Sequence, residues 1–320
     1  MTSEAAGSAS GIAELDAERR REREAYGEGA LIVCDRVVRI YAGDGIEVQA
    51  LQGLDLLVAQ GELTAIIGAS GSGKSTLMNI LAGLDRPTAG TVRVGGHDLS
   101  LLSGRERLAY RRSVVGFIWQ QTARNLLPYL TGLQNVLMPM KLAGLGRRDR
   151  SRRAADLLDA LDVVHCAGRV PERMSGGEQQ RTAIATALAN APRLLLADEP
   201  TGELDTASAA DVFTALQTAN AELGATVLVV THDPAVSGQV RRTVAIRDGR
   251  TSSETLRHDA EADAAAVAVE YAVLDRAGRV QLPRDMTRRL GMRDRVRLEE
   301  QPDHVGVWPD RAAPRADGEA

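Results

Sequence analysis

The chain has 320 residues, enough for one large domain or two modest ones, and 44% of them are hydrophobic, so it can bury a sizeable core. Aromatic residues make up only 3%, which excludes a stacking platform for nucleic acid. The formal net charge of −4 also argues against a wholly basic nucleic-acid binder.

The N-terminal residues 1–28 are rich in alanine, glutamate and arginine and lack the apolar stretch of a secretory signal. We expect them to form a disordered arm. The longest uncharged run, Asn125–Met140, is too short and too polar to cross a bilayer, so a role at a membrane would need a partner protein. The two cysteines, Cys34 and Cys166, are far apart and are predicted to be reduced, buried thiols.

Residues 29–250 are predicted to form an α/β domain. Residues from about 121 to 185 show helical periodicity and are expected to form a helical subdomain. Short apolar runs elsewhere predict strands, the first two in an antiparallel β-subdomain and the later ones in a buried parallel sheet. These runs are Leu31–Tyr41, Ile46–Val58, Leu63–Gly68, Leu194–Ala197, Thr226–Val230 and Thr243–Gly249.

A glycine-rich segment follows the run Leu63–Gly68 and opens a predicted helix. It matches the pattern GxxxxGK[ST] in the context that a phosphate-binding P-loop requires. Backbone N–H groups can close around phosphates there, and the helix N-terminus adds a favourable dipole. Lys74 is expected to reach the β- and γ-phosphates of ATP, and Ser75 to bind Mg²⁺. The predicted nucleotide-binding residues of this segment are Gly68, Ser70, Gly71, Ser72, Gly73, Lys74, Ser75 and Thr76.

An acidic pair, Asp198 and Glu199, follows the apolar run Leu194–Ala197. An acid at the end of such a strand can bind the Mg²⁺ of a P-loop site, which is the role expected for Asp198. Glu199 beside it can polarise the attacking water as a general base. Acidic residues at strand ends are common, but in a chain with a P-loop the catalytic interpretation is the stronger one.

The segment Ser175-Gly176-Gly177-Glu178-Gln179 opens another predicted helix between these two motifs. Small residues at a helix N-terminus can bind an anion. The segment resembles the signature of ABC ATPases, which binds the γ-phosphate of ATP held by the opposite subunit. The resemblance therefore implies nucleotide-binding roles for Ser175, Gly176, Gly177 and Glu178, and a partner that is a second copy of the chain or a homologous ATPase subunit.

Four further residues occur in the order along the chain in which the same family carries its motifs. Gln120 resembles the glutamine that contacts Mg²⁺ and senses the transmembrane partner, and Asp205 resembles the acid that reaches across the dimer. His232 resembles the histidine that contacts the γ-phosphate. Tyr41 resembles the aromatic residue that stacks on adenine, although a tyrosine packed on a sheet edge is the simpler alternative.

Three segments narrow the resemblance to the lipoprotein-releasing and macrolide-exporter branch: Leu81–Thr88, Asn135–Pro139 and Ala197–Gly202. This implies a mixed α/β P-loop core that binds ATP and Mg²⁺ and hydrolyses ATP to power a separate transmembrane permease. The chain would then be cytoplasmic, bound at the inner face of the cell membrane through that permease.

Residues 251–268 are polar and rich in alanine and are expected to link this domain to a smaller unit at 269–310, followed by a disordered tail at 311–320. In the smaller unit, strands are predicted at Tyr271–Asp275, Arg279–Leu282, Val296–Leu298 and Val305–Val307, and a short helix between Pro283 and Gly291. The pattern resembles AbrB-like swapped-hairpin domains, which are dimeric. Such domains often bind DNA, but equal numbers of arginines and acids argue against DNA as a partner here.

Three alternative functions remain open on the sequence alone. A DNA-repair or chromosome-organising ABC ATPase would carry a long coiled coil between the P-loop and the signature, and no sustained heptads occur there. A DNA-binding regulator switched by ATP would act through the C-terminal unit. A mechanotransmission ATPase would drive a membrane protein without moving cargo, and the sequence does not separate that function from transport.

Overall fold

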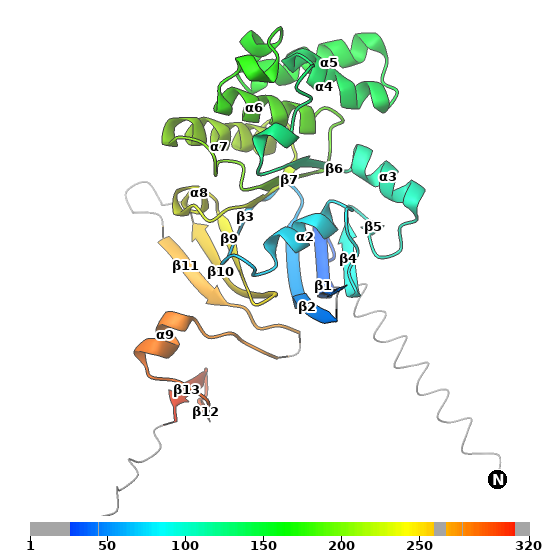
Figure 1. The fold of residues 1–320 in the computed structure, drawn as a ribbon. Coiled ribbons are helices and arrows are strands. Elements are labelled where there is room, and N and C mark those ends of the chain that lie inside the picture. Colours follow the sequence, from blue (N-terminus) through cyan, green and yellow to red (C-terminus); the bar gives the residue numbers. More distant parts are fainter. Residues whose placement is uncertain (1–25, 44, 259–266, 277, 311–320) are drawn as a thin grey trace, which may run out of the picture.

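The computed structural model describes residues 26–43, 45–258, 267–276 and 278–310 (Figure 1). The strands are β1 (Ala30–Gly43), β2 (Ile46–Ala59), β3 (Leu63–Ile67), β4 (Ala89–Val94), β5 (His97–Asp98), β6 (Val115–Ile118), β7 (Leu194–Asp198), β8 (Thr226–Val230), β9 (Arg242–Arg247), β10 (Arg250–His258), β11 (Val267–Ala272), β12 (Val296–Glu300) and β13 (Val305–Pro309). The helices are α2 (Lys74–Leu81), α3 (Gly104–Ser113), α4 (Gly132–Leu142), α5 (Arg147–Ala160), α6 (Gly176–Ala187), α7 (Thr206–Ala221), α8 (Pro234–Gly238) and α9 (Arg284–Arg289), with short 3₁₀ turns η1 (Thr122–Arg124), η2 (Val164–Cys166) and η3 (Pro171–Arg173).

A seven-stranded sheet in the order β11-β10-β9-β3-β8-β7-β6 runs through the centre of the molecule. The five strands from β9 to β6 are parallel, whereas β10 and β11 are added antiparallel at one edge. A second sheet, in the order β2-β1-β4-β5, is antiparallel throughout. These two sheets confirm the predicted mixed core with an antiparallel β-subdomain.

The parallel strands β3, β7 and β8 of the central sheet are buried on both faces, which explains why they are continuous apolar runs rather than alternating ones. In β7, Leu194 and Leu196 pack toward α2 and the antiparallel sheet, while Leu195 and Ala197 pack toward α6 and α7. All four side chains have no exposed surface. Burial of this kind contributes roughly 1.5–3 kcal/mol for each leucine.

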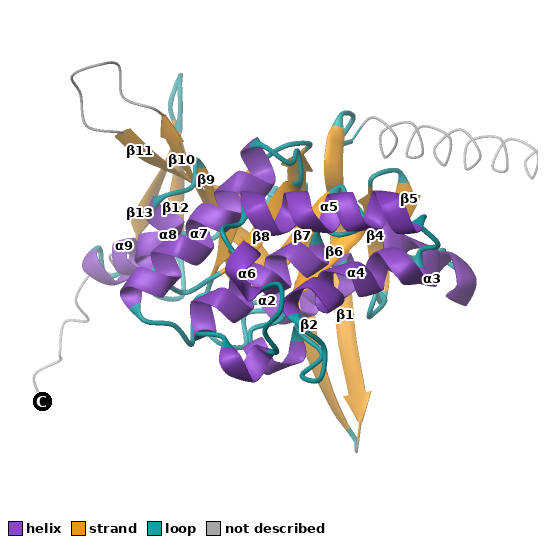
Figure 2. Cartoon of the chain, turned by 90° about the horizontal axis from the view of Figure 1, so that it is seen from above, coloured by secondary structure: helices purple, strands orange, loops and turns teal. Residues whose placement is uncertain are grey.

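The helices form separate layers around this sheet. Figures 1 and 2 show α4, α5, α6 and α7 gathered on one side of the central sheet, with α2 and the antiparallel sheet on the other. Capping boxes fix the starts of α4 and α6, in which Thr131 pairs with Gln134 and Ser175 with Glu178. Helices therefore occupy the predicted subdomain between residues 121 and 185. No described helix is long and apolar enough to span a membrane.

Residues 1–25 of the predicted N-terminal arm lie outside the described residues. Its last three residues do not fit the prediction, because Tyr26–Glu28 form an ordered turn that leads into β1. The Arg93 guanidinium donates a hydrogen bond to the carbonyl oxygen of Tyr26 over 2.8 Å. Leu31 and Ile32, which follow directly in β1, are buried. They fix the end of the turn against the sheet.

The prediction of a linker at 251–268 is wrong for residues 251–258, which belong to β10. Pairing with β9 satisfies the backbone hydrogen-bonding groups of this polar segment, and its side chains have polar partners from other elements. Thr251 Oγ1 donates to the carbonyl oxygen of Asp55, and Glu254 forms an ion pair with Arg242 at 2.7 Å. A strand stabilised in this way carries no hydrophobic pattern, so its composition suggested a linker. Residues 259–266 of the predicted linker lie outside the described residues.

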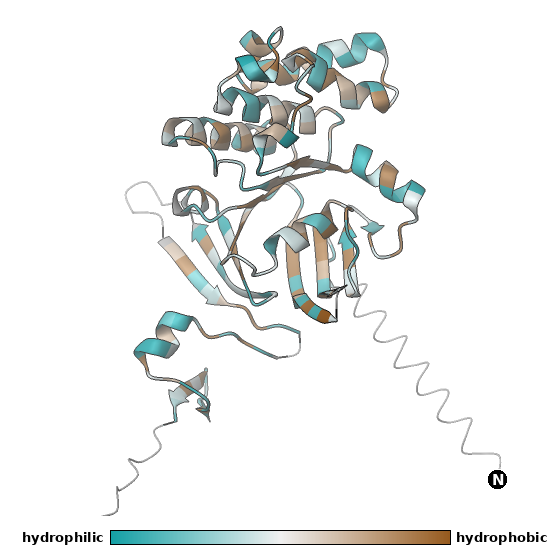
Figure 3. Cartoon of the chain, in the orientation of Figure 1, coloured by the Kyte–Doolittle hydropathy of each residue, from teal (hydrophilic) through white to brown (hydrophobic). Residues whose placement is uncertain are grey.

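The predicted boundary at residue 269 is also wrong, because β11 pairs with β10 and belongs to the central sheet. The predicted hairpin of Tyr271–Asp275 with Arg279–Leu282 is reduced to a single bridge between Leu274 and Val280. Further on, α9 and the hairpin of β12 with β13 confirm the expected helix and last two strands. Figure 3 shows hydrophobic colour along the central strands and hydrophilic colour over most of α9.

Candidate active site

Four loops meet at one edge of the central sheet because the parallel strands before them all end there. The P-loop follows β3, Gln120 follows β6, the acidic pair ends β7, and His232 follows β8. The loops border a cavity of about 670 Å³, within the size range of small-molecule sites. The predicted residues that line it are Tyr41, Gly68, Ser70, Gly71, Gly73, Lys74, Ser75, Thr76, Gln120, Asp198, Glu199 and His232.

The P-loop adopts a backbone conformation that favours glycine. Gly73, the N-cap of α2, has φ 105°, and a Cβ there would lie 2.6 Å from the carbonyl oxygen of Ala50. Lys74 Nζ donates to the carbonyl oxygens of Gly68 and Ala69 over 2.8 and 2.9 Å. An ammonium has three donors, so one remains for a phosphate. Ser72 is the predicted P-loop residue that does not line the cavity; it is buried, and its Oγ has no hydrogen-bond partner among the described residues.

The Glu199 carboxylate is held between the two loops beside it. Gln120 Nε2 donates to Glu199 Oε2 over 3.0 Å, and His232 Nδ1 lies 3.2 Å from Glu199 Oε1. The backbone N–H of Glu199 donates to the carbonyl oxygen of Val230 over 2.8 Å. Glu199 has φ 46°, a left-handed conformation that costs a non-glycine residue about 1 kcal/mol or more. The fold thus holds this carboxylate in one place at the cavity.

Asp198 is half-buried next to Glu199. Burial and the negative charge of Glu199 raise the pKa of Asp198, and the Lys74 ammonium partly offsets them. A divalent cation would relieve this repulsion. The nearby hydroxyl of Ser75 and amide of Gln120 supply the oxygen ligands that Mg²⁺ prefers. The donor set and the glycine cradle therefore fit a magnesium–nucleotide complex.

Tyr41 borders the cavity from β1. Its hydroxyl donates to Asp85 Oδ2 over 2.8 Å, and the Arg39 guanidinium carbon lies 4.2 Å from the ring centroid. Tyr41 is 39% exposed and lines the cavity. Its stacking on adenine stays a prediction.

Sequence analysis missed the contribution of β2 to the cavity wall, which Val48, Gln49 and Ala50 provide. The signal was available, because the hairpin of β1 with β2 places Val48 directly opposite Tyr41. If Tyr41 lies at the site, its cross-strand neighbours in β2 are expected to lie there too.

The signature lies apart from this cavity. Ser175 and Gly176 are exposed at the start of α6. Ser175 Oγ accepts from the Glu178 backbone N–H over 3.2 Å, and Glu178 Oε2 accepts from the Ser175 backbone N–H over 2.7 Å. The Ser175 backbone N–H, His165 and the Ser175 hydroxyl together hold the pKa of Glu178 at about 2.

Asp205 lies beside the signature rather than beside the P-loop. It caps α7 by accepting hydrogen bonds from the backbone N–H and hydroxyl groups of Ser208 and from the backbone N–H of Ala207, and these bonds lower its pKa. A Cβ on Gly176 would lie 2.9 Å from Leu204, the residue before Asp205. None of Ser175, Gly176, Gly177, Glu178 and Asp205 lines the P-loop cavity of its own chain.

Comparisons with known proteins agree with this geometry. The sequence profile of the ABC transporter family matches residues 51–202. The lipoprotein-releasing system ATP-binding protein LolD of Geobacter metallireducens is 42% identical over 214 residues, which cover 67% of this chain and 94% of that protein. This chain belongs to the ABC transporter family.

Other members of the ABC transporter family match the same region. LolD 2 of Caulobacter vibrioides is 46% identical over 69% of this chain and 94% of its own length. The macrolide export ATP-binding/permease protein MacB of Chromobacterium violaceum is 47% identical over 69% of this chain, and the match spans about a third of MacB. A dimeric ATP-binding cassette solved in a post-hydrolysis state with ADP and Pi has 37% identity and a TM-score of 0.64, covering 70% of this chain and 98% of that one.

Proposed function

We propose that this chain is the ATP-hydrolysing subunit of an ABC transporter and works with a separate transmembrane permease. The observation that carries the proposal is the Glu199 carboxylate, held between Gln120 and His232 at the edge of a P-loop cavity. A fixed acid at that position can activate a water molecule for attack on the γ-phosphate.

In the proposed reaction the P-loop N–H groups and Lys74 hold the phosphates of ATP. Mg²⁺, when bound by Ser75, Asp198 and Gln120, neutralises phosphate charge. Glu199 accepts a proton from the attacking water at its carboxylate. A bond forms between the water oxygen and the γ-phosphorus, and the bond from that phosphorus to the bridging oxygen of ADP breaks.

The site is proposed to be completed by a second copy or by a homologous ATPase subunit. Because the signature and Asp205 lie away from the cavity of their own chain, they can contact nucleotide only on another chain. Exposure of Ser175 and Gly176 supports this, and so do the dimeric cassettes among the structural relatives. His232 would contact the γ-phosphate and Tyr41 the adenine.

The permease and the location are proposed from the relatives. LolD is the ATP-binding protein of a lipoprotein-releasing system, and MacB joins ATP-binding and permease functions. We propose that this chain is cytoplasmic and binds the inner face of the cell membrane through a permease, in transport rather than in mechanotransmission without cargo. Affinity purification of the tagged chain from membranes should yield one polytopic partner, whose absence would contradict the proposal.

The C-terminal unit, residues 278–310, is proposed to be an AbrB-like dimerisation module rather than a DNA-binding regulator. Several of its arginines are paired with acids, such as Arg295 with Asp310 at 2.8 Å and Arg297 with Glu299 at 3.6 Å, which weakens a basic surface for DNA. A lone two-stranded sheet is marginal in water, and a second copy would cover the exposed Leu298 and Val305, which share one face of the hairpin.

Light scattering of the full chain without nucleotide tests this module. The wild type should be a dimer, and Leu298→Asp should make it a monomer. Leu101→Asp places the same charge at another exposed leucine, between β5 and α3, and should leave the dimer intact. A monomeric wild type would contradict the proposal.

A further inference from the structure

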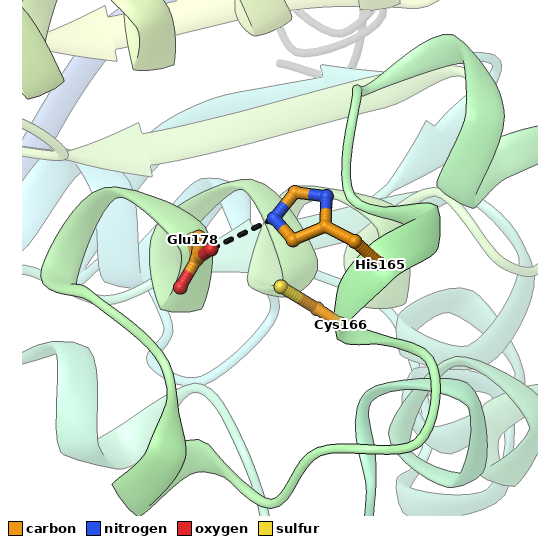
Figure 4. A group of neighbouring side chains, drawn as sticks. All are labelled: His165, Cys166 and Glu178. Carbon is orange, nitrogen blue, oxygen red and sulfur yellow. Dashed lines mark hydrogen bonds and ion pairs between the residues drawn. The ribbon is translucent and has the colours of Figure 1, made fainter.

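Three potential metal ligands meet beside the first turn of α6 (Figure 4). His165 and Cys166 come from η2, and Glu178 comes from α6. Their ligand atoms all lie within 4.8 Å of one another, and His165 Nε2 is 2.7 Å from Glu178 Oε1. None of the three belongs to the P-loop cavity.

The local fold holds these ligands in place. Glu178 Oε2 is occupied by the Ser175 backbone N–H, which leaves Oε1 turned toward His165. The η2 segment is tied to the start of α4, because the Leu133 backbone N–H donates to the carbonyl oxygen of Ala167 over 3.1 Å. Cys166 is fully buried, whereas the His165 side chain is 45% exposed. The group is therefore enclosed on the Cys166 side and open to solvent on the His165 side.

The chemistry of the three ligands favours one class of ion. A thiolate and an imidazole with a carboxylate suit Zn²⁺ and related transition metals, whereas Mg²⁺ prefers oxygen ligands alone. We propose that His165, Cys166 and Glu178 bind one divalent transition-metal ion of the Zn²⁺ class, with a fourth position open to water. On binding, the Cys166 thiol loses its proton to solvent and the sulfur bonds the metal.

One cation in the structure competes with such an ion. Arg169 Nη1 lies 3.4 Å from Glu178 Oε1, the oxygen assigned to the metal. The Arg169 side chain is 46% exposed and can turn into solvent, so an entering ion displaces it. Removing this guanidinium should strengthen metal binding, an effect that a purely structural role of the three ligands would not produce.

The bound ion would join η2 to the first turn of α6, where Glu178 caps the signature. Under the proposed function that turn approaches ATP on the partner chain, and this consequence alone rests on that proposal. Metal binding itself is measured without nucleotide, so a failure of the metal site and a failure of the ATPase assignment give separate results.

The test is titration of the full, nucleotide-free chain with Co²⁺, followed by absorption of the thiolate-to-cobalt charge-transfer band. We expect one ion per chain and displacement by Zn²⁺. Cys166→Ser should abolish the band and weaken binding at least about 100-fold, and His165→Asn should weaken it at least about 10-fold. Cys34→Ser is the matched control, because Cys34 is equally buried but lies in β1, and it should change nothing.

Arg169→Gln should bind Co²⁺ more tightly than the wild type while keeping the same band. The proposal is overturned if no thiolate band forms, if the band survives Cys166→Ser, or if His165→Asn leaves the affinity unchanged. Co²⁺ bound only through oxygen ligands, as at the proposed Mg²⁺ site, gives no such band and also counts against it.

Discussion

The strands β8 and β12 differ in how their side chains are covered. All five residues of β8 are buried in the central sheet, whereas all five residues of β12 are exposed. The central domain, residues 30–258 together with β11, thus folds around its own core. The C-terminal unit has no such core, so its structure depends on contacts outside itself.

Several polar contacts join the two regions. Arg276, just before the C-terminal unit, forms an ion pair with the buried Asp35 at 3.1 Å and lies over the ring of Tyr26. Arg247 of β9 donates to Gln281 Oε1 over 3.2 Å and to the carbonyl oxygen of Leu282 over 3.0 Å. Arg276 is partly exposed and Asp35 keeps a second ion pair with Arg36 at 3.1 Å, so this junction stabilises weakly and the two regions should respond very differently to substitution.

The largest expected difference is in stability. Leu196→Ala removes a fully buried side chain of β7 and should lower the free energy of unfolding by about 2–5 kcal/mol. Leu298→Ala removes a side chain that is 67% exposed and should change it by less than about 0.5 kcal/mol in the monomer. Denaturant unfolding of both variants measures the two changes in the free energy of unfolding. Equal losses would contradict the expected difference between the two regions.

Nucleotide binding should depend on the central domain alone. Lys74→Ala removes a charged donor to the phosphates and should weaken ATP binding at least about 10-fold. Lys141→Ala, at an exposed lysine of α4, is the control and should bind normally. A chain ending at Ala277 should also bind ATP like the wild type in a fluorescence titration. Loss of affinity in that truncated chain would show that the C-terminal unit belongs to the site.

The smallest expected effect concerns the junction. Arg276→Ala removes the ion pair with Asp35 and the contact with Tyr26, and should cost about 1 kcal/mol or less. Hydrogen exchange should increase in α9 and β12 while β7 and β8 stay protected. Faster exchange throughout the central sheet would mean that the two regions unfold together.

The central domain could be predicted from sequence because its signals are local. Leu194–Ala197 and Thr226–Val230 are apolar because both faces of their strands are buried, and the observed strands differ from them by one residue at most. Both cysteines are buried and free, as expected. The convergence of Gln120, Glu199 and His232 follows from parallel topology, since each follows a strand that ends at the same edge.

The features that could not be predicted depend on tertiary contacts, which leave no pattern in the local sequence. The strand β10 is polar because ion pairs such as Glu254 with Arg242 replace apolar packing. The meeting of His165 and Cys166 with Glu178 joins η2 to α6 across the intervening loop. Their chemistry was visible in the sequence, but their proximity required the fold.

The central claim, that this chain hydrolyses ATP through Glu199, is tested most directly by single-turnover ATPase measurements. Glu199→Gln should keep ATP binding, slow hydrolysis at least about 100-fold and trap an ATP-bound dimer. Glu203→Gln makes the same change at an exposed acid four residues along and should hydrolyse ATP normally. Hydrolysis by Glu199→Gln at a rate close to that of the wild type would contradict the claim.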